Sequence, residues 1–123
     1  MTPIEEVEEI QTRCLSSVPN DSESRKIELD WCASTIARVG EMTANAKKVL
    51  SAKKLEVIKT ITIPDQYSAT MFKSMVETAV ADEQYLVDRL EGLQKALGRR
   101  FDSTQSALSF DKVDRMASGA QQG

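Results

Sequence analysis

The stretch LVDRLEGLQKALGRRFDSTQSALSFDK occupies residues 86–112 and contains no proline. Apolar side chains recur in it every three or four residues, which is the spacing of one face of an α-helix. The stretch therefore predicts a long helix with one apolar stripe. The stripe consists of Leu86, Leu90, Leu93, Leu97, Phe101 and Leu108.

The same pattern extends in both directions and predicts a helix over residues 68–116, with Ser68 as its N-cap. Residues 117–123 are small and polar, so we expect a frayed tail. An unbroken helix of this length would extend about 70 Å, far more than a compact globule of this size. The sequence leaves open whether the helix is continuous from 68 to 116.

Two other helices are predicted upstream. Residues 1–18 begin with Thr2, Pro3 and Glu5, a capping box with proline in the first turn. Turn-forming residues follow, and a second apolar pattern predicts a helix over 22–60. Its β-branched end, VIKTITI at residues 57–63, is also compatible with a short extended segment before Pro64.

These elements predict an all-α fold in a single domain, with a short N-terminal helix followed by a long antiparallel helical hairpin. The chain has 123 residues and only 5% aromatic residues, a composition typical of helical bundles and coiled coils. One partner helix covers only part of the stripe in such a hairpin. We therefore expect a homo-oligomeric bundle with the six stripe residues at the subunit interface.

Charges are distributed in a way that favours the hairpin. Folding about Pro64 would bring Arg99 and Arg100 toward Glu28 and Asp30 near one end. The lysines between residues 47 and 54 would approach acidic residues between 77 and 83. Exposed pairs of this kind contribute less than about 1 kcal/mol each, but they fix the orientation of the helices.

The two cysteines, Cys14 and Cys32, lie 18 positions apart in a chain without histidine. This spacing does not match a zinc site, and we interpret both thiols as packing residues. The acidic N-terminus MTPIEEVEEI does not resemble a signal peptide, and no apolar run approaches the length of a membrane span. These features predict a cytoplasmic protein that does not associate with a membrane.

Most catalytic constellations are missing from the sequence. Without histidine there is no Ser-His or Cys-His pair, and the five glycines form no phosphate-binding loop. A pair of carboxylates remains possible in any helical bundle. We nevertheless predict that the protein is not an enzyme and holds neither a metal nor a cofactor.

Two basic clusters are candidates for binding an anionic ligand. AKKVLSAKK contains Lys47, Lys53 and Lys54, and GRRF contains Arg99 and Arg100. Arginine suits phosphate because its guanidinium binds two oxygens at once. An aromatic ring for base stacking would come from a residue such as Trp31 or Tyr85. The alternative is that these charges form solvated faces and pairs between helices.

The segments QYLVDRLEGL at residues 84–93 and DSTQSALSFDK at 102–112 resemble small helical early proteins of bacteriophages and prophages, often encoded close to recombination genes. The resemblance covers about residues 25–116 and is clearest at Tyr85–Asp88 and Ser103–Lys112. It implies a protein of the infected bacterial cytoplasm, with no catalytic residues to transfer.

The resemblance implies two functions. In the first, an oligomer counteracts host defence by sequestering a nucleotide signal or by binding a defence protein. In the alternative, the chain is an accessory protein of phage recombination that binds an annealing protein or single-stranded DNA. The net charge of −3 disfavours direct contact with nucleic acid.

Overall fold

The computed structural model describes residues 1–61 and 68–122, with side chains described up to residue 113. This part of the chain forms four helices and no strand, which confirms the all-α prediction. The helices are α1 (Pro3–Cys14), α2 (Ser22–Thr60), α3 (Ala69–Ala79) and α4 (Ala81–Gln122). Among the described helices, none contains an apolar run long enough to cross a membrane.

Polar side chains cap the helix starts. The Thr2 hydroxyl accepts a hydrogen bond from the Glu5 amide, and the Glu5 carboxylate accepts one from the Thr2 amide, so the predicted capping box is present. Asp21 accepts from the Ser24 amide at 2.9 Å and caps α2. Ser68 caps α3, as predicted, by accepting from the amide of Met71.

The region expected as one helix over 68–116 is divided at Val80, where the backbone leaves helical geometry (φ −110°, ψ 18°). No glycine or proline marks this point in the sequence. The break separates α3 from the axis of α4 while the Val80 side chain remains buried in the core.

The ends of the two long helices also differ from the prediction or extend it. α4 continues to Gln122, beyond the predicted helix end at 116. The β-branched residues up to Thr60 are helical in α2, and residues 62 and 63 lie outside the described part.

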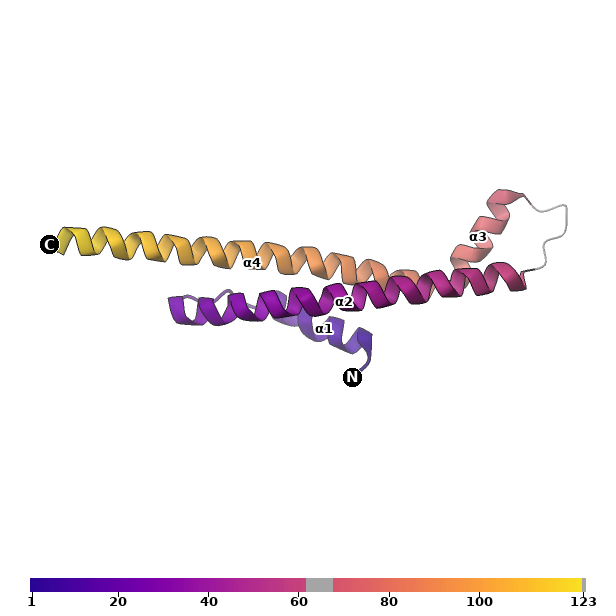
Figure 1. Ribbon diagram of the computed structural model, residues 1–123, viewed down its shortest axis with the longest axis horizontal. Coiled ribbons are helices and arrows are strands. Elements are labelled where there is room, and N and C mark those ends of the chain that lie inside the picture. Colours follow the sequence, from indigo (N-terminus) through magenta and orange to yellow (C-terminus); the bar gives the residue numbers. More distant parts are fainter. Residues whose placement is uncertain (62–67, 123) are drawn as a thin grey trace.

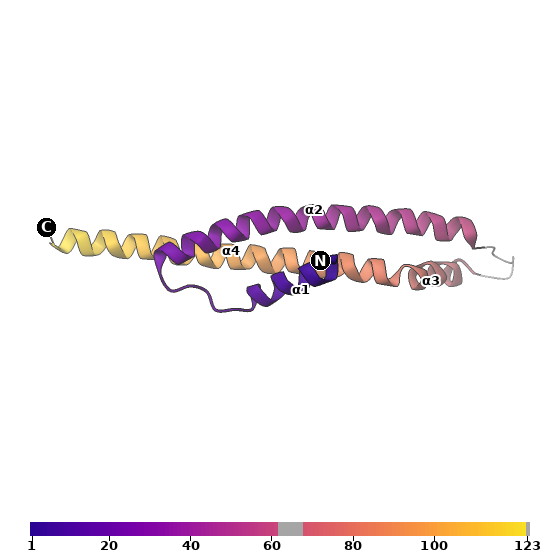
Figure 2. The same cartoon turned by 90° about the horizontal axis from the view of Figure 1, so that it is seen from below.

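α2 and α4 lie side by side and run in opposite directions (Figures 1 and 2). α1 packs along the middle of this pair, so three helices surround the core there. α3 contacts α2 and lies at the end of the pair where α2 finishes. In Figure 1, α1 lies below the pair and α3 rises above it.

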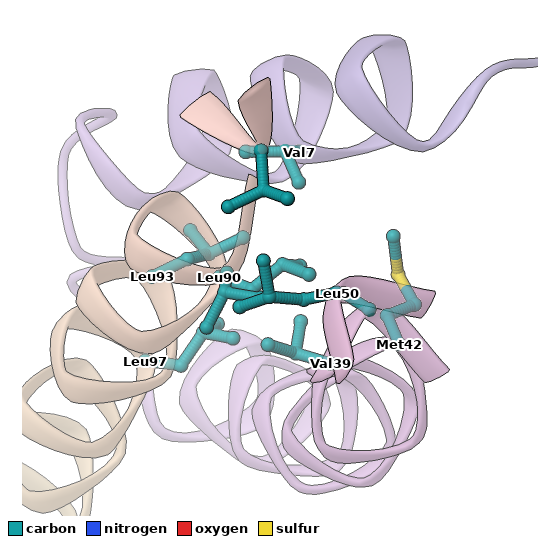
Figure 3. Close-up of a cluster of buried hydrophobic side chains, with 10 residues drawn as sticks. Val7, Val39, Met42, Leu50, Leu90, Leu93 and Leu97 are labelled. Carbon is teal, nitrogen blue, oxygen red and sulfur yellow. The ribbon is translucent and has the colours of Figure 1, made fainter. Parts of the chain in front are cut away.

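The leucine stripe of α4 is covered mainly by helices of its own chain. Figure 3 shows Val7 of α1 pointing toward Leu90, Leu93 and Leu97, with side chains of α2 on the other side. Leu97 is 0% exposed in the single chain, and Leu90 and Leu93 are also buried. The buried cluster consists of Val7, Val39, Met42, Ala46, Leu50, Val80, Val87, Leu90, Leu93 and Leu97.

Leu90, Leu93 and Leu97 are therefore buried within the single chain, where α1 supplies much of the cover that the prediction assigned to a second copy. Leu86, Phe101 and Leu108 are only partly buried, so they retain some exposed surface.

Candidate functional site

Arg100 forms part of the interior rather than of an exposed anion site. The residue is only 8% exposed, and its Nε donates to the carboxylate of Glu28. Its Nη1 donates to the backbone carbonyls of Cys14 at 3.1 Å and Ser16 at 2.9 Å. Carbonyls at the end of a helix lack partners within the helix, so this guanidinium caps α1. The donors that the prediction assigned to an anionic ligand are thus occupied by groups of the chain itself.

Glu28 is the acidic centre of this arrangement, and it accepts from Arg13 at 3.2 Å as well as from Arg100. Burial raises the pKa of its carboxyl, but hydrogen bonds from Arg100 and Arg13 outweigh that effect, and the net pKa is lowered. The expected approach of Arg100 to Glu28 is thus confirmed. Arg99, in contrast, is exposed and forms no ion pair with any residue in the described part of the chain.

The predicted lysine cluster faces acidic residues. Lys53 pairs with Glu83, as the charge pattern predicted, and Lys47 pairs with Glu91 at 3.1 Å. Lys54 lines a surface hollow of about 560 Å³ together with Glu77 and Asp88. Lys47 and Lys53 are therefore paired with carboxylates, and Lys54 shares its hollow with two of them, which lowers the attraction of this cluster for an anionic ligand.

The two predicted aromatic residues lie apart from each other. Trp31 is partly buried against the core, and the guanidinium of Arg13 lies 4.0 Å from the centre of its ring. Tyr85 lines the same hollow as Lys54, and its hydroxyl accepts from Arg89 at 3.1 Å. Among the predicted ligand-binding residues, this hollow brings together only Lys54 and Tyr85.

An open apolar groove lies between α2 and α4 next to the start of α1, and we call it the α1-end groove. It encloses about 390 Å³. Its apolar lining includes Met1, Met42, Ala46, Val49, Leu86 and Leu90. The groove exists because α1 has only 12 residues and covers only part of the much longer α2 and α4. Sequence reasoning identified Leu86 and Leu90 but missed the α2 side of the groove.

A second exposed apolar surface lies on α3. Met71 and Met75 are 49% and 42% exposed, and we call this pair the α3 face. Residues four positions apart lie on the same side of a helix, so the two thioethers are neighbours. Methionine adapts its shape easily and is common on surfaces that bind protein helices. The spacing of these two methionines is visible in the sequence, but spacing alone does not show that this side of the helix is uncovered.

No group of three metal-ligating side chains occurs among the residues that the structure describes. Searches against protein-family models, curated proteins and solved structures found no match to this chain.

The cysteine thiols are expected to react slowly in the folded protein. Burial raises the pKa of Cys32 to about 11 and also raises the pKa of Cys14. At pH 8 only about one Cys32 thiol in a thousand would be the reactive thiolate. Ellman's reagent should therefore label Cys32 over hours in buffer and within minutes in urea. Complete labelling of the folded protein within minutes, or an intramolecular disulfide in freshly prepared protein, would contradict this interpretation.

Proposed function

We propose that this chain is a non-enzymatic helical protein that self-associates and acts by binding another protein. One observation favours a protein rather than a nucleotide as the ligand. The cations predicted to bind phosphate are largely paired with carboxylates, whereas apolar side chains are exposed on α3 and along the α1-end groove.

The charge arrangement disfavours a phosphate-bearing ligand. Binding a nucleotide at the Lys54 hollow would place its phosphates near Glu77 and Asp88. Two carboxylates against one ammonium group repel an anion more than they attract it. Arg99 remains as an exposed cation, but an isolated exposed arginine forms neither a pocket nor a stacking surface.

The α3 face is the surface that we assign to the protein partner. α3 projects from the end of the bundle on the side away from α1 (Figure 1), and both methionines are exposed, so a partner can reach them without displacing the core helices. Exposed methionines surrounded by polar residues are typical of adaptable protein-binding surfaces. The resemblance to phage early proteins favours a host defence protein as the partner. An annealing protein of phage recombination is the alternative.

A binding experiment tests the proposal. We expect calorimetry to show that cyclic dinucleotides, ADP-ribose derivatives and short single-stranded DNA bind the wild-type chain with dissociation constants above about 100 μM, a binding free energy weaker than about −5.5 kcal/mol. A partner that copurifies from phage-infected cells should be a protein, identified by native mass spectrometry. A copurifying host protein with a role in defence supports the first assignment. A copurifying annealing protein of phage recombination supports the alternative.

The α3 face supplies the matched variants for this experiment. Met71→Glu with Met75→Glu should abolish capture of the protein partner, because two charges would have to be desolvated in the interface. Phe110→Glu on α4 is the control: it changes an apolar residue that is even more exposed, at 73%, and should leave capture intact. Nucleotide binding tighter than 100 μM that is lost in Lys53→Ala with Lys54→Ala would contradict the proposal.

A further inference from the structure

The pair formed by α2 and α4 is covered unequally along its length. In the middle, α1 lies against the pair and buries the side chains between the two helices. Past the start of α1, the same side of the pair forms the open α1-end groove. α3 lies on the opposite side of the pair in Figure 1, and the residues that line the groove do not come from α3. The groove is thus the continuation of the surface that α1 covers.

The side chains at this groove form an incomplete core. Val49 is 58% exposed although it lies beside Met42 and Ala46, both of which are buried. Leu86 is partly exposed at the opposite wall, which α4 supplies. Fully burying one such aliphatic side chain contributes about 1.5 to 3 kcal/mol, so covering the groove is favourable.

The charges around the groove are balanced. Glu6 pairs with Arg38 at 2.9 Å, and Glu83 pairs with Lys53, so each carboxylate at the edge has a cation beside it. Two identical surfaces repel each other when both carry the same net charge. Each groove edge carries two positive and two negative groups, so two copies can approach each other without electrostatic repulsion.

We infer that the α1-end groove is where two copies of this chain meet, each copy covering the open side of the other's α2 and α4. In this arrangement two helices from each copy form a short four-helix bundle beyond α1. A two-fold axis makes the same patch serve both copies. This inference rests on the self-association in the proposed function and assigns it to a surface.

The exposed area of the chain is consistent with a second copy as the occupant. A compact monomer of 13.6 kDa exposes roughly 6,600 Å². This chain exposes 8657 Å². The difference of about 2,000 Å² is spread over the whole elongated chain, and the open side of α2 and α4 would have to supply roughly 800 Å² of it for a standard interface. The α3 face lies outside that side of the pair and would stay free.

Sedimentation equilibrium with a matched pair of variants tests this contact. The wild-type chain should have a mass of about 27 kDa, twice the 13.6 kDa of one chain, at micromolar concentration. Val49→Glu should weaken the dimer by about a hundredfold or more, because the charge would be desolvated in the interface. Ile27→Glu is the control, since Ile27 also lies on α2 and is similarly exposed at 61%, but does not line the groove.

Circular dichroism should show the same helix content in both variants, since neither side chain is buried in the monomer. A monomeric wild-type chain would overturn both the self-association and this contact. A dimer that Val49→Glu leaves intact, or that Ile27→Glu disrupts equally, would overturn only the assignment to the groove. Capture of the protein partner by a monomeric Val49→Glu variant would show that the α3 face acts independently.

Discussion

Replacing Arg100 with alanine is expected to lower the free energy of unfolding by about 3 to 5 kcal/mol. The substitution leaves the buried carboxylate of Glu28 with only Arg13 beside it and removes the donors to the carbonyls at the end of α1. Urea denaturation followed by circular dichroism measures the change. A loss of this size is a large fraction of the total stability of a small domain.

The neighbouring arginine provides the control for this prediction. Arg99→Ala should change the free energy of unfolding by less than about 0.5 kcal/mol, because Arg99 is exposed. Arg100→Lys should restore only part of the loss, since one ammonium group cannot reach the carboxylate and the carbonyls as a guanidinium does. Equal effects of Arg99→Ala and Arg100→Ala would contradict the structural role of Arg100.

The same ion pair makes stability depend on pH in a defined direction. Because the pKa of Glu28 is lower in the folded chain than in the unfolded chain, the folded state binds fewer protons at this site. Its contribution is present above the unfolded pKa of about 4.3 and is lost as the pH falls through the folded value. In Glu28→Gln, the acid-induced loss of stability should be smaller than in the wild-type chain.

Leu97→Ala is expected to cost about 2 to 5 kcal/mol through the cavity that it leaves in the core. Leu97 is fully buried within a single chain between α4, α2 and α1. The loss should therefore appear as a lower urea midpoint, and the dimer should persist in buffer. Leu55→Ala is the matched control, because Leu55 is mostly exposed on α2. Dissociation to folded monomers without loss of monomer stability would contradict the intrachain assignment.

Much of the helical architecture could be predicted from periodicity and capping. Thr2 and Glu5 marked the start of α1, and Ser68 marked the start of α3, because caps depend on residues adjacent in sequence. The pairing of Lys53 with Glu83 followed from the charge distribution. Local patterns and the sequence of charges were sufficient for these features.

Other features depend on contacts that local patterns do not contain. α1 packs onto the leucine stripe through Val7, and no pattern in the sequence shows where a short amphipathic helix will pack. The burial of Arg100 follows from that packing, because the end of α1 lies over its guanidinium. Arg99 and Arg100 are chemically identical neighbours, so only the direction of each side chain separates their roles. The break at Val80 likewise could not be predicted, because no glycine or proline lies at that position.

The surroundings of the candidate site residues depend on the same long-range packing. The charge pattern predicted that Lys53 would approach Glu83, but it did not show that Lys47 pairs with Glu91, which lies on α4 far away in sequence. The α1-end groove also arises from a difference in length between α1 and the two helices beneath it. Such a surface can be recognised only after the helices are placed together.

An isotope-filtered NOE experiment on a dimer of labelled and unlabelled chains tests most directly where the copies meet. The account predicts intermolecular NOEs to the methyl groups of Val49 and Leu86 in the α1-end groove and none to Leu93 or Leu97, which α1 covers within each chain. Intermolecular NOEs to Leu93 and Leu97, with none at Val49 and Leu86, would contradict it and restore the leucine stripe as the subunit interface.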